Sequence, residues 1–188
     1  IDSIQYASRI QTAMLPLKVK IDEFLPEYFI VFKPRDIVSG DFYWFKGLYQ
    51  SKLIIAAADC TGHGVPGAFM SILGISALNE ITSRDINLHA SEILNELRIG
   101  IKKALRQTGF ESETKDGMDI ALCIIDKNNR KVEYAGANNA LFMIKNNESG
   151  SLELTEIKAD RMPVGVYMEE KESFTTTVTL CIPNVLNI

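Results

Sequence analysis

The chain has 188 residues, of which 46% are hydrophobic and 23% are charged, and its formal net charge is −4. Acidic and basic residues are interspersed, so the chain lacks the basic stripe that nucleic-acid binding requires. The longest apolar runs, such as residues 53–58, are far shorter than the ~20 residues of a membrane helix, and no signal pattern precedes them. Three widely spaced cysteines outside any CxxC pattern indicate reduced thiols. We therefore expect a cytoplasmic domain without direct membrane contact.

The first predicted element is an N-terminal helix. Apolar residues recur at steps of three and four through residues 2–14, and the pattern ends just before Pro16. This helix could pack on the domain or pair with another helix. Because the sequence begins inside the helical pattern, we expect residues 1–16 to continue from an upstream region and residues 17–188 to form the domain.

The rest of the sequence predicts short strands and two longer helices. A helix from residue 66 that is apolar on nearly all sides and an amphipathic helix over residues 89–107 are predicted. Strands are predicted over residues 27–33, 41–48, 52–59, 118–125, 131–135, 140–145, 152–157 and 173–180. Runs of strands followed by helices favour an α+β sandwich over a repeated βαβ unit.

One predicted hairpin brings two carboxylates together. If the strands over residues 41–48 and 52–59 are joined by a tight turn, paired positions sum to about 100 and Asp41 lies opposite Asp59. Like charges in that position destabilise a sheet, so a shared proton, a basic neighbour or a divalent cation must compensate. Hard cations such as Mg²⁺ and Mn²⁺ prefer carboxylate and carbonyl oxygens. On this geometry alone, a metal site and a solvated pair of carboxylates both remain open.

Four blocks of sequence carry a family resemblance. They are PRDIVSGDFYW (34–44), ADCTGHGVPGAFMS (58–71), KDGMDIALCIID (115–126) and YAGANNALF (134–142). In order and spacing they resemble the SpoIIE-like branch of the bacterial metal-dependent serine/threonine protein phosphatases, the PPM superfamily. The segment SIQYASRIQTAMLP (3–16) is similar to the linker helix that joins such domains to an upstream sensor.

The resemblance implies a fold and a metal site. The expected fold is a four-layer α-β-β-α sandwich of two antiparallel sheets flanked by helices, which holds two Mn²⁺ or Mg²⁺ ions at one end. Asp41 would bridge the ions, Asp59 would act through its carboxylate and Cys60 through its backbone carbonyl. Asp119 is expected to be either an outer metal ligand or a residue that orients the metal loops. Asp116 is expected to form only a turn.

The resemblance also implies an activity. Metal-activated water would remove phosphate from serine or threonine of a regulatory partner protein, typically a STAS-type anti-sigma-factor antagonist. Family members continue past the strand at residues 174–180 into further strands and aspartates that complete the metal site, and this sequence contains none of these aspartates. We therefore expect missing terminal strands, weak metal binding, weak or absent activity, and a homodimer through the N-terminal helix or an exposed sheet edge.

Two alternative functions stay in view. The first is a non-catalytic signalling or binding module of the same fold, which the missing aspartates favour. The second is a nucleotide-binding or phosphate-binding domain suggested by the glycines of residues 62–67. That segment matches neither the Walker pattern nor GxGxxG, so the second alternative is the weaker one.

Overall fold

The computed structural model describes residues 2–48, 51–85, 87–108, 115–146, 150–169 and 172–180. The helices are α1 (Asp2–Met14), α2 (Lys18–Asp22), α3 (Gly64–Arg84) and α4 (Ala90–Ala104). The strands are β1 (Phe42–Gly47), β2 (Lys52–Cys60), β3 (Gly117–Asp126), β4 (Lys131–Ala137), β5 (Leu141–Asn146), β6 (Leu152–Ile157), β7 (Val164–Gly165) and β8 (Thr177–Leu180). The predicted α+β class is confirmed.

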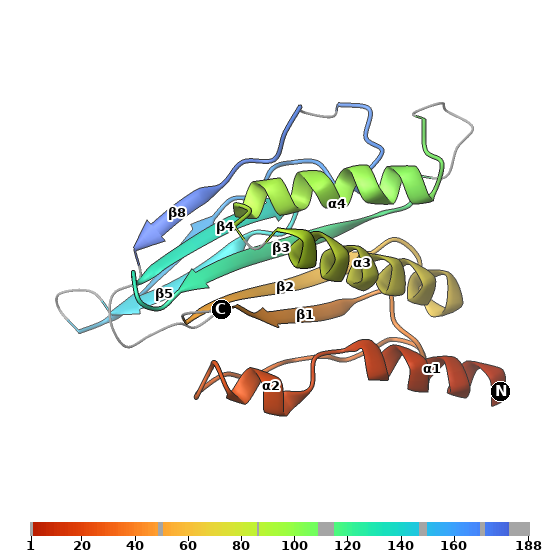
Figure 1. Cartoon of the computed structure of the whole chain (residues 1–188), viewed down its shortest axis with the longest axis horizontal. Coiled ribbons are helices and arrows are strands. Elements are labelled where there is room, and N and C mark those ends of the chain that lie inside the picture. The colour runs from red at the N-terminus through yellow and green to blue at the C-terminus, as the bar shows by residue number, and fades with distance from the viewer. Residues whose placement is uncertain are drawn as a thin grey trace.

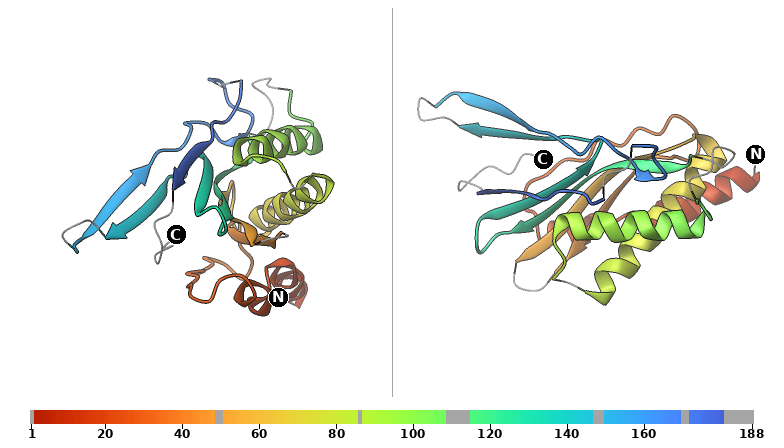
Figure 2. Two further views of the ribbon diagram at one scale, coloured as in Figure 1. Left: turned by 60° about the vertical axis from the view of Figure 1, so that its left-hand side comes forward. Right: turned by 90° about the horizontal axis from the view of Figure 1, so that it is seen from above.

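The strands form two antiparallel sheets, as predicted. The large sheet has the order β1-β2-β3-β4-β8, with the short strand β7 paired to β3, and β5 pairs with β6 in a separate hairpin. Helices α3 and α4 lie side by side along one face of the large sheet, whereas α1 and α2 lie beside its β1 edge (Figure 1). The β5–β6 hairpin extends away from the face opposite α3 and α4 (Figure 2).

The main core lies between the large sheet and the two long helices. Alternate residues of β1 and β2 point toward the helices, among them Phe42, Trp44 and Ile54, and they pack with the apolar faces of α3 and α4. Of the described helices, α3 alone is long and apolar enough to meet the requirements for crossing a membrane, and 44% of that stretch is buried in the fold. Its burial against the sheet explains why its sequence is apolar on nearly all sides.

A second, smaller core covers the opposite face of the sheet. Here the side chains that alternate with the first set, including Leu53, Cys123 and Tyr134, are buried with Leu141 of the β5–β6 hairpin. Phe24, in the segment after α2, packs on this cluster and meets Phe45 edge-to-face with ring centroids 5.7 Å apart. Both faces of the central strands are therefore covered, which explains their continuous apolar sequence.

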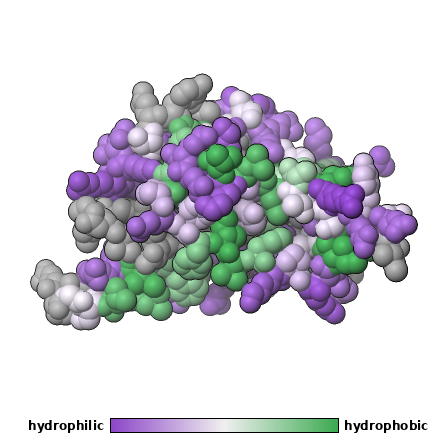
Figure 3. All heavy atoms as spheres, turned by 90° about the horizontal axis from the view of Figure 1, so that it is seen from below, coloured by the Kyte–Doolittle hydropathy of each residue, from purple (hydrophilic) through white to green (hydrophobic). Residues whose placement is uncertain are grey.

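The prediction of a strand at residues 27–33 is wrong. This segment is irregular and is paired with no described strand, and the side chains of Phe29 and Val31 are each 74% exposed. β-branched and aromatic residues gave it a strand-like pattern, but a strand exists only where a neighbour accepts its hydrogen bonds. Figure 3 shows apolar side chains at several places on the lower face of the molecule.

The other differences concern short elements and one strand start. Helix α2 and strand β7 are too short to produce a periodic signal and were not predicted. The strand predicted from residue 173 begins only at Thr177, because Phe174 N–H and Thr175 N–H donate to the side chains of Asn95 and Asp160 instead of a neighbouring strand. Residues 49–50 of the predicted tight turn, residues 109–114 and residues 181–188 lie outside the described residues.

Candidate metal centre

The β1–β2 hairpin has the register that the sequence predicts. Phe42 lies opposite Ala58 and Trp44 lies opposite Ala56, so each pair of positions sums to 100. Asp41 and Asp59 are the next residues outward from the Phe42–Ala58 pair, and they share the face of the sheet opposite α3 and α4. The two carboxyl groups are close enough to form a hydrogen bond with each other.

A third carboxylate continues this row on the next strand. Asp119 of β3 lies directly opposite Asp59 of β2. Beyond the end of β4, Asn138 donates a hydrogen bond from Nδ2 to Asp119 Oδ1 at 2.8 Å, and its φ of 57° places it in the left-handed region that asparagine tolerates. Asp119 therefore has an orienting partner in Asn138.

Asp41 and Asp59 carry like charges that no basic side chain in the described structure offsets. Partial burial raises the pKa of Asp41, and the hydrogen bond with Asp59 and the charge of Asp59 raise it further. Among the described residues, no Lys or Arg contributes an opposing effect. Burial, followed by the charges of Asp59 and Asp41, raises the pKa of the Cys60 thiol to about 12. The thiol therefore stays neutral, so the backbone carbonyl oxygen of Cys60 is a better ligand for a hard cation than its sulfur.

Glycines allow the two acidic loops to approach each other. A Cβ atom on Gly40 would lie 2.7 Å from the carbonyl oxygen of Gly62, and one on Gly67 would lie 2.6 Å from the same oxygen. These are backbone atoms, which a side chain cannot displace cheaply. Gly62 also has a φ of 83°, a conformation that favours glycine. The glycines around the two aspartates thus permit close packing of the segment before Asp41, the segment after Asp59 and the first turn of α3.

Thr61 fastens the loop after Asp59 to the start of β3. Its N–H donates to the Gly117 carbonyl at 3.0 Å, while its Oγ1 accepts from Gly117 N–H and donates to Asp116 Oδ1, both at 3.1 Å. The structure assigns no turn at Asp116, and its carboxylate instead holds this loop. Two residues further along this loop, His63 is exposed and its Nδ1 lies 3.1 Å from Asp36 Oδ2.

The atom types available as ligands fit a hard divalent cation. Asp41, Asp59 and the carbonyl of Cys60 supply oxygen atoms, and the two carboxylates share their negative charge without a basic partner in the described structure. Within the described residues, no group of three or more His, Cys, Asp or Glu side chains converges closely enough to hold a metal ion. The described side-chain ligands are thus the two carboxylates of Asp41 and Asp59.

Comparisons with known proteins point to one family. The family model described as stage II sporulation protein E matches residues 50–184. The SiaA-PP2C domain of Pseudomonas aeruginosa is similar in structure, with a TM-score of 0.81 at 31% identity over 97% of this chain and 67% of that one. No curated protein matches the chain.

More distant solved structures share the fold. A PP2C phosphatase domain with a fragment of the regulatory domain of SpoIIE from Bacillus subtilis has a TM-score of 0.56 at 20% identity, over 77% of this chain and 39% of that one. RsbX in complex with magnesium has a TM-score of 0.51 at 15% identity, over 77% of this chain and 62% of that one. This chain therefore spans only part of the length of these solved relatives.

Proposed function

Because the chain belongs to the stage II sporulation protein E family and has the PP2C phosphatase fold, we propose that it is a metal-dependent protein serine/threonine phosphatase. The observation that carries this proposal is the pairing of Asp41 with Asp59 at the end of β1 and β2, without a basic partner among the described residues. A pair of like charges is retained where a bound cation compensates for it.

We assign the metal-binding roles residue by residue. Asp41 would bridge two Mn²⁺ or Mg²⁺ ions, Asp59 would bind through its carboxylate, and Cys60 through its carbonyl. Asp119 would act as an outer ligand or orient the loops, and its hydrogen bond from Asn138 supports the orienting role. Bound cations of this kind acidify water and neutralise the charge of phosphoryl oxygens.

The exposure of the site supports the proposed substrate class. Asp41 and Asp59 are both exposed, and they lie at the end of a sheet rather than at the base of a buried cavity. Such a site can receive a phosphorylated side chain that is still attached to a folded protein. We propose phosphoserine or phosphothreonine on a regulatory partner, with a STAS-type anti-sigma-factor antagonist as the candidate that the sequence resemblance implies.

The test is hydrolysis of p-nitrophenyl phosphate and of a phosphoserine peptide as a function of Mn²⁺ concentration. Wild-type protein is compared with Asp41→Asn and Asp59→Asn, and with Asp126→Asn at the other end of β3 as the control. We expect activity that depends on Mn²⁺ and that falls about 100-fold or more in each site variant, because each variant lacks one of the two metal-binding carboxylates. Activity that survives both substitutions contradicts the assignment.

A non-catalytic binding module of the same fold is the second candidate. It is favoured by the small number of carboxylates that converge among the described residues. This candidate predicts that wild-type protein binds a phosphorylated partner but hydrolyses neither substrate at saturating Mn²⁺. Pull-down of a phosphorylated STAS domain combined with the hydrolysis assay separates the two candidates.

We also propose a cytoplasmic location and self-association through α1, which resembles the family's linker helix. Tyr6 and Ile10 of α1 are 64% and 46% exposed. Light scattering across a concentration series tests the dimer, and Ile10→Glu is expected to shift it toward monomer. A monomer at all concentrations contradicts self-association, and recovery of the protein in the membrane fraction of expressing cells contradicts the location.

A further inference from the structure

Gln11 is a buried polar residue on a helix that is otherwise largely exposed. Only 6% of its surface is accessible, and it is the one described residue of α1 in the buried class. Its Oε1 accepts a hydrogen bond from Ser39 N–H at 2.9 Å, and its Nε2 donates to the Ser39 carbonyl at 2.6 Å. The side-chain amide therefore pairs with both backbone groups of one residue, as a neighbouring strand would.

This pairing ties α1 to the segment that carries Asp41. Ser39 is buried, and its Oγ accepts a hydrogen bond from the backbone N–H of Asp41 at 3.0 Å. Nε2 of Gln11 also donates to Ser71 Oγ of α3 at 2.7 Å, and Ser71 Oγ lies 3.2 Å from the Ser39 carbonyl. A continuous network of hydrogen bonds thus runs from α1 and α3 through Ser39 to the backbone of Asp41.

Steric contacts constrain the same segment from its other side. Gly40 packs against the backbone of Gly62 and Gly67 without room for a side chain. The segment is therefore held between glycine backbone atoms and the amide of Gln11. Removal of the amide would leave the N–H of Ser39 buried without its partner, and the segment would shift to recover a hydrogen bond.

We propose that Gln11 is a positioning residue for the metal centre, which holds Ser39 so that the Asp41 carboxylate meets Asp59 in the geometry for cation binding. The inference rests on the proposed function. Gln11 bonds to Ser39 and Ser71 and acts on a cation only through Asp41, because hydrogen-bonded supports of a ligand orient it before the metal arrives.

The experiment is isothermal titration with Mn²⁺, in parallel with hydrolysis of p-nitrophenyl phosphate at rising Mn²⁺ concentration. Gln11→Met preserves side-chain length but removes all three hydrogen bonds. Ser71→Ala removes the bond from Gln11 to α3 and the bonds of the Ser71 hydroxyl to the Ser39 and Ala68 carbonyls, but it keeps both bonds between Gln11 and Ser39, so it serves as a milder variant that is expected to fold. Asn95→Leu is the matched control, because it removes a side-chain bond to the backbone N–H of Phe174, away from the acidic row.

For Gln11→Met we expect Mn²⁺ affinity to fall about 10- to 100-fold, the usual range for residues that support a metal ligand, with a smaller fall for Ser71→Ala. The rate at saturating Mn²⁺ should return close to that of the wild type, because the catalytic groups are intact. Asn95→Leu should lower the melting temperature and leave Mn²⁺ affinity unchanged.

Equal Mn²⁺ affinity in Gln11→Met and wild-type protein overturns the inference, as does an equal loss of affinity in Asn95→Leu. Absence of Mn²⁺ binding in the wild type is a separate result. It contradicts the proposed function, and the inference about Gln11 falls because it rests on that function.

Discussion

Asp59 of β2 lies directly opposite Asp119 of β3, and on its other side the carboxyl group of Asp59 is close enough to interact with that of Asp41. Three adjacent chain segments thus bring carboxylates to one end of the sheet. In the absence of a cation, their repulsion opposes folding. The same groups that would hold a metal are therefore expected to reduce the stability of the metal-free protein.

The first prediction concerns how charge repulsion at the acidic residues and cation binding affect stability. Asp41→Asn should raise the melting temperature of the metal-free protein, because it removes one of two opposed like charges, an effect of up to about 1 kcal/mol. In a chain of this length that corresponds to about 2–4 °C. The same variant should lose the stabilisation that Mn²⁺ gives the wild type. Thermal unfolding with and without Mn²⁺ measures both effects, and a lower metal-free melting temperature in the variant would contradict the charge argument.

The second prediction concerns the glycines that pack the acidic loops. Gly67→Ala should destabilise the protein by about 1–3 kcal/mol and weaken Mn²⁺ binding, because the new Cβ would lie 2.6 Å from the Gly62 carbonyl oxygen and 2.9 Å from Gly40 Cα. Gly100→Ala in α4 is the matched control, since no atom lies within 4 Å of its Cβ position. That control should gain about 0.5–1 kcal/mol of stability from helix propensity. Urea denaturation compares the two, and equal effects would refute the steric account.

The third prediction distinguishes the backbone of Cys60 from its side chain. The Cys60 side chain is 3% exposed and belongs to the core beneath the helices, on the opposite face of the sheet from Asp59. Cys60→Ala should therefore cost about 1 kcal/mol of stability through lost packing and leave the Mn²⁺ dissociation constant unchanged. Isothermal titration provides the measurement. A marked loss of Mn²⁺ affinity in this variant would show that the thiol takes part in binding.

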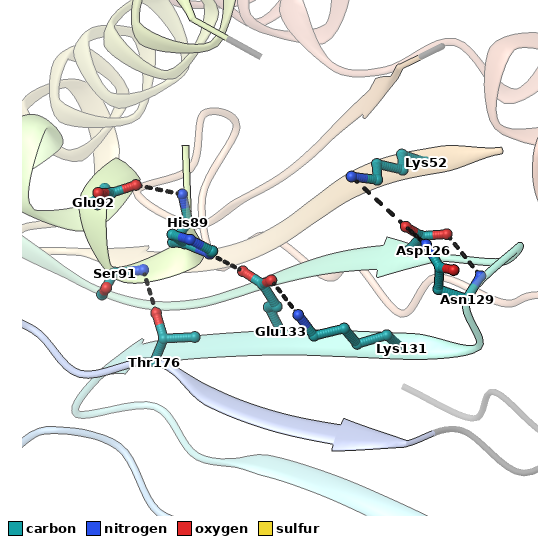
Figure 4. Close-up of polar contacts among 9 residues, drawn as sticks. All are labelled: Lys52, His89, Ser91, Glu92, Asp126, Asn129, Lys131, Glu133 and Thr176. Carbon is teal, nitrogen blue, oxygen red and sulfur yellow. Dashed lines mark hydrogen bonds and ion pairs between the residues drawn. The ribbon is translucent and has the colours of Figure 1, made fainter. Parts of the chain in front are cut away.

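The fourth prediction is a pH dependence at the start of α4. The hydrogen bond and charge of Glu133 raise the pKa of His89, with a smaller contribution from Glu92, while the charge of Lys131 lowers it (Figure 4). A raised histidine pKa contributes stability that is fully present below the unfolded value of about 6.5 and is lost as pH rises through the folded pKa. His89→Gln should therefore lower the melting temperature more at pH 6 than at pH 9.

The control for this pH effect is the same substitution in a Glu133→Gln background. The backbone N–H of His89 donates to Glu92 at 2.6 Å, and because neither substitution changes these two groups, we expect this part of the helix cap to be preserved. Because Glu133 provides the largest effect on His89, the difference between pH 6 and pH 9 should shrink in this background. A difference of undiminished size would show that another group controls the titration.

The sequence predicted the parts of the structure that depend on local rules. Helical periodicity marked α1, α3 and α4, and strand pattern with a short connection set the register that brings Asp41 beside Asp59. Side-chain alternation and the length of a connection act over a few residues, so they can be read without knowledge of the fold.

Tertiary structure alone decided the contacts between distant segments. Residues 27–33 carry a strand pattern but have no partner strand in the described structure, and Asn138 turned out to orient Asp119 across 19 residues of chain. Gln11 reads in the sequence as one polar residue among several on a helix, yet it reaches Ser39, 28 positions away. Which buried donor meets which acceptor depends on how whole elements pack, and that packing is a collective result of the core rather than of any local pattern.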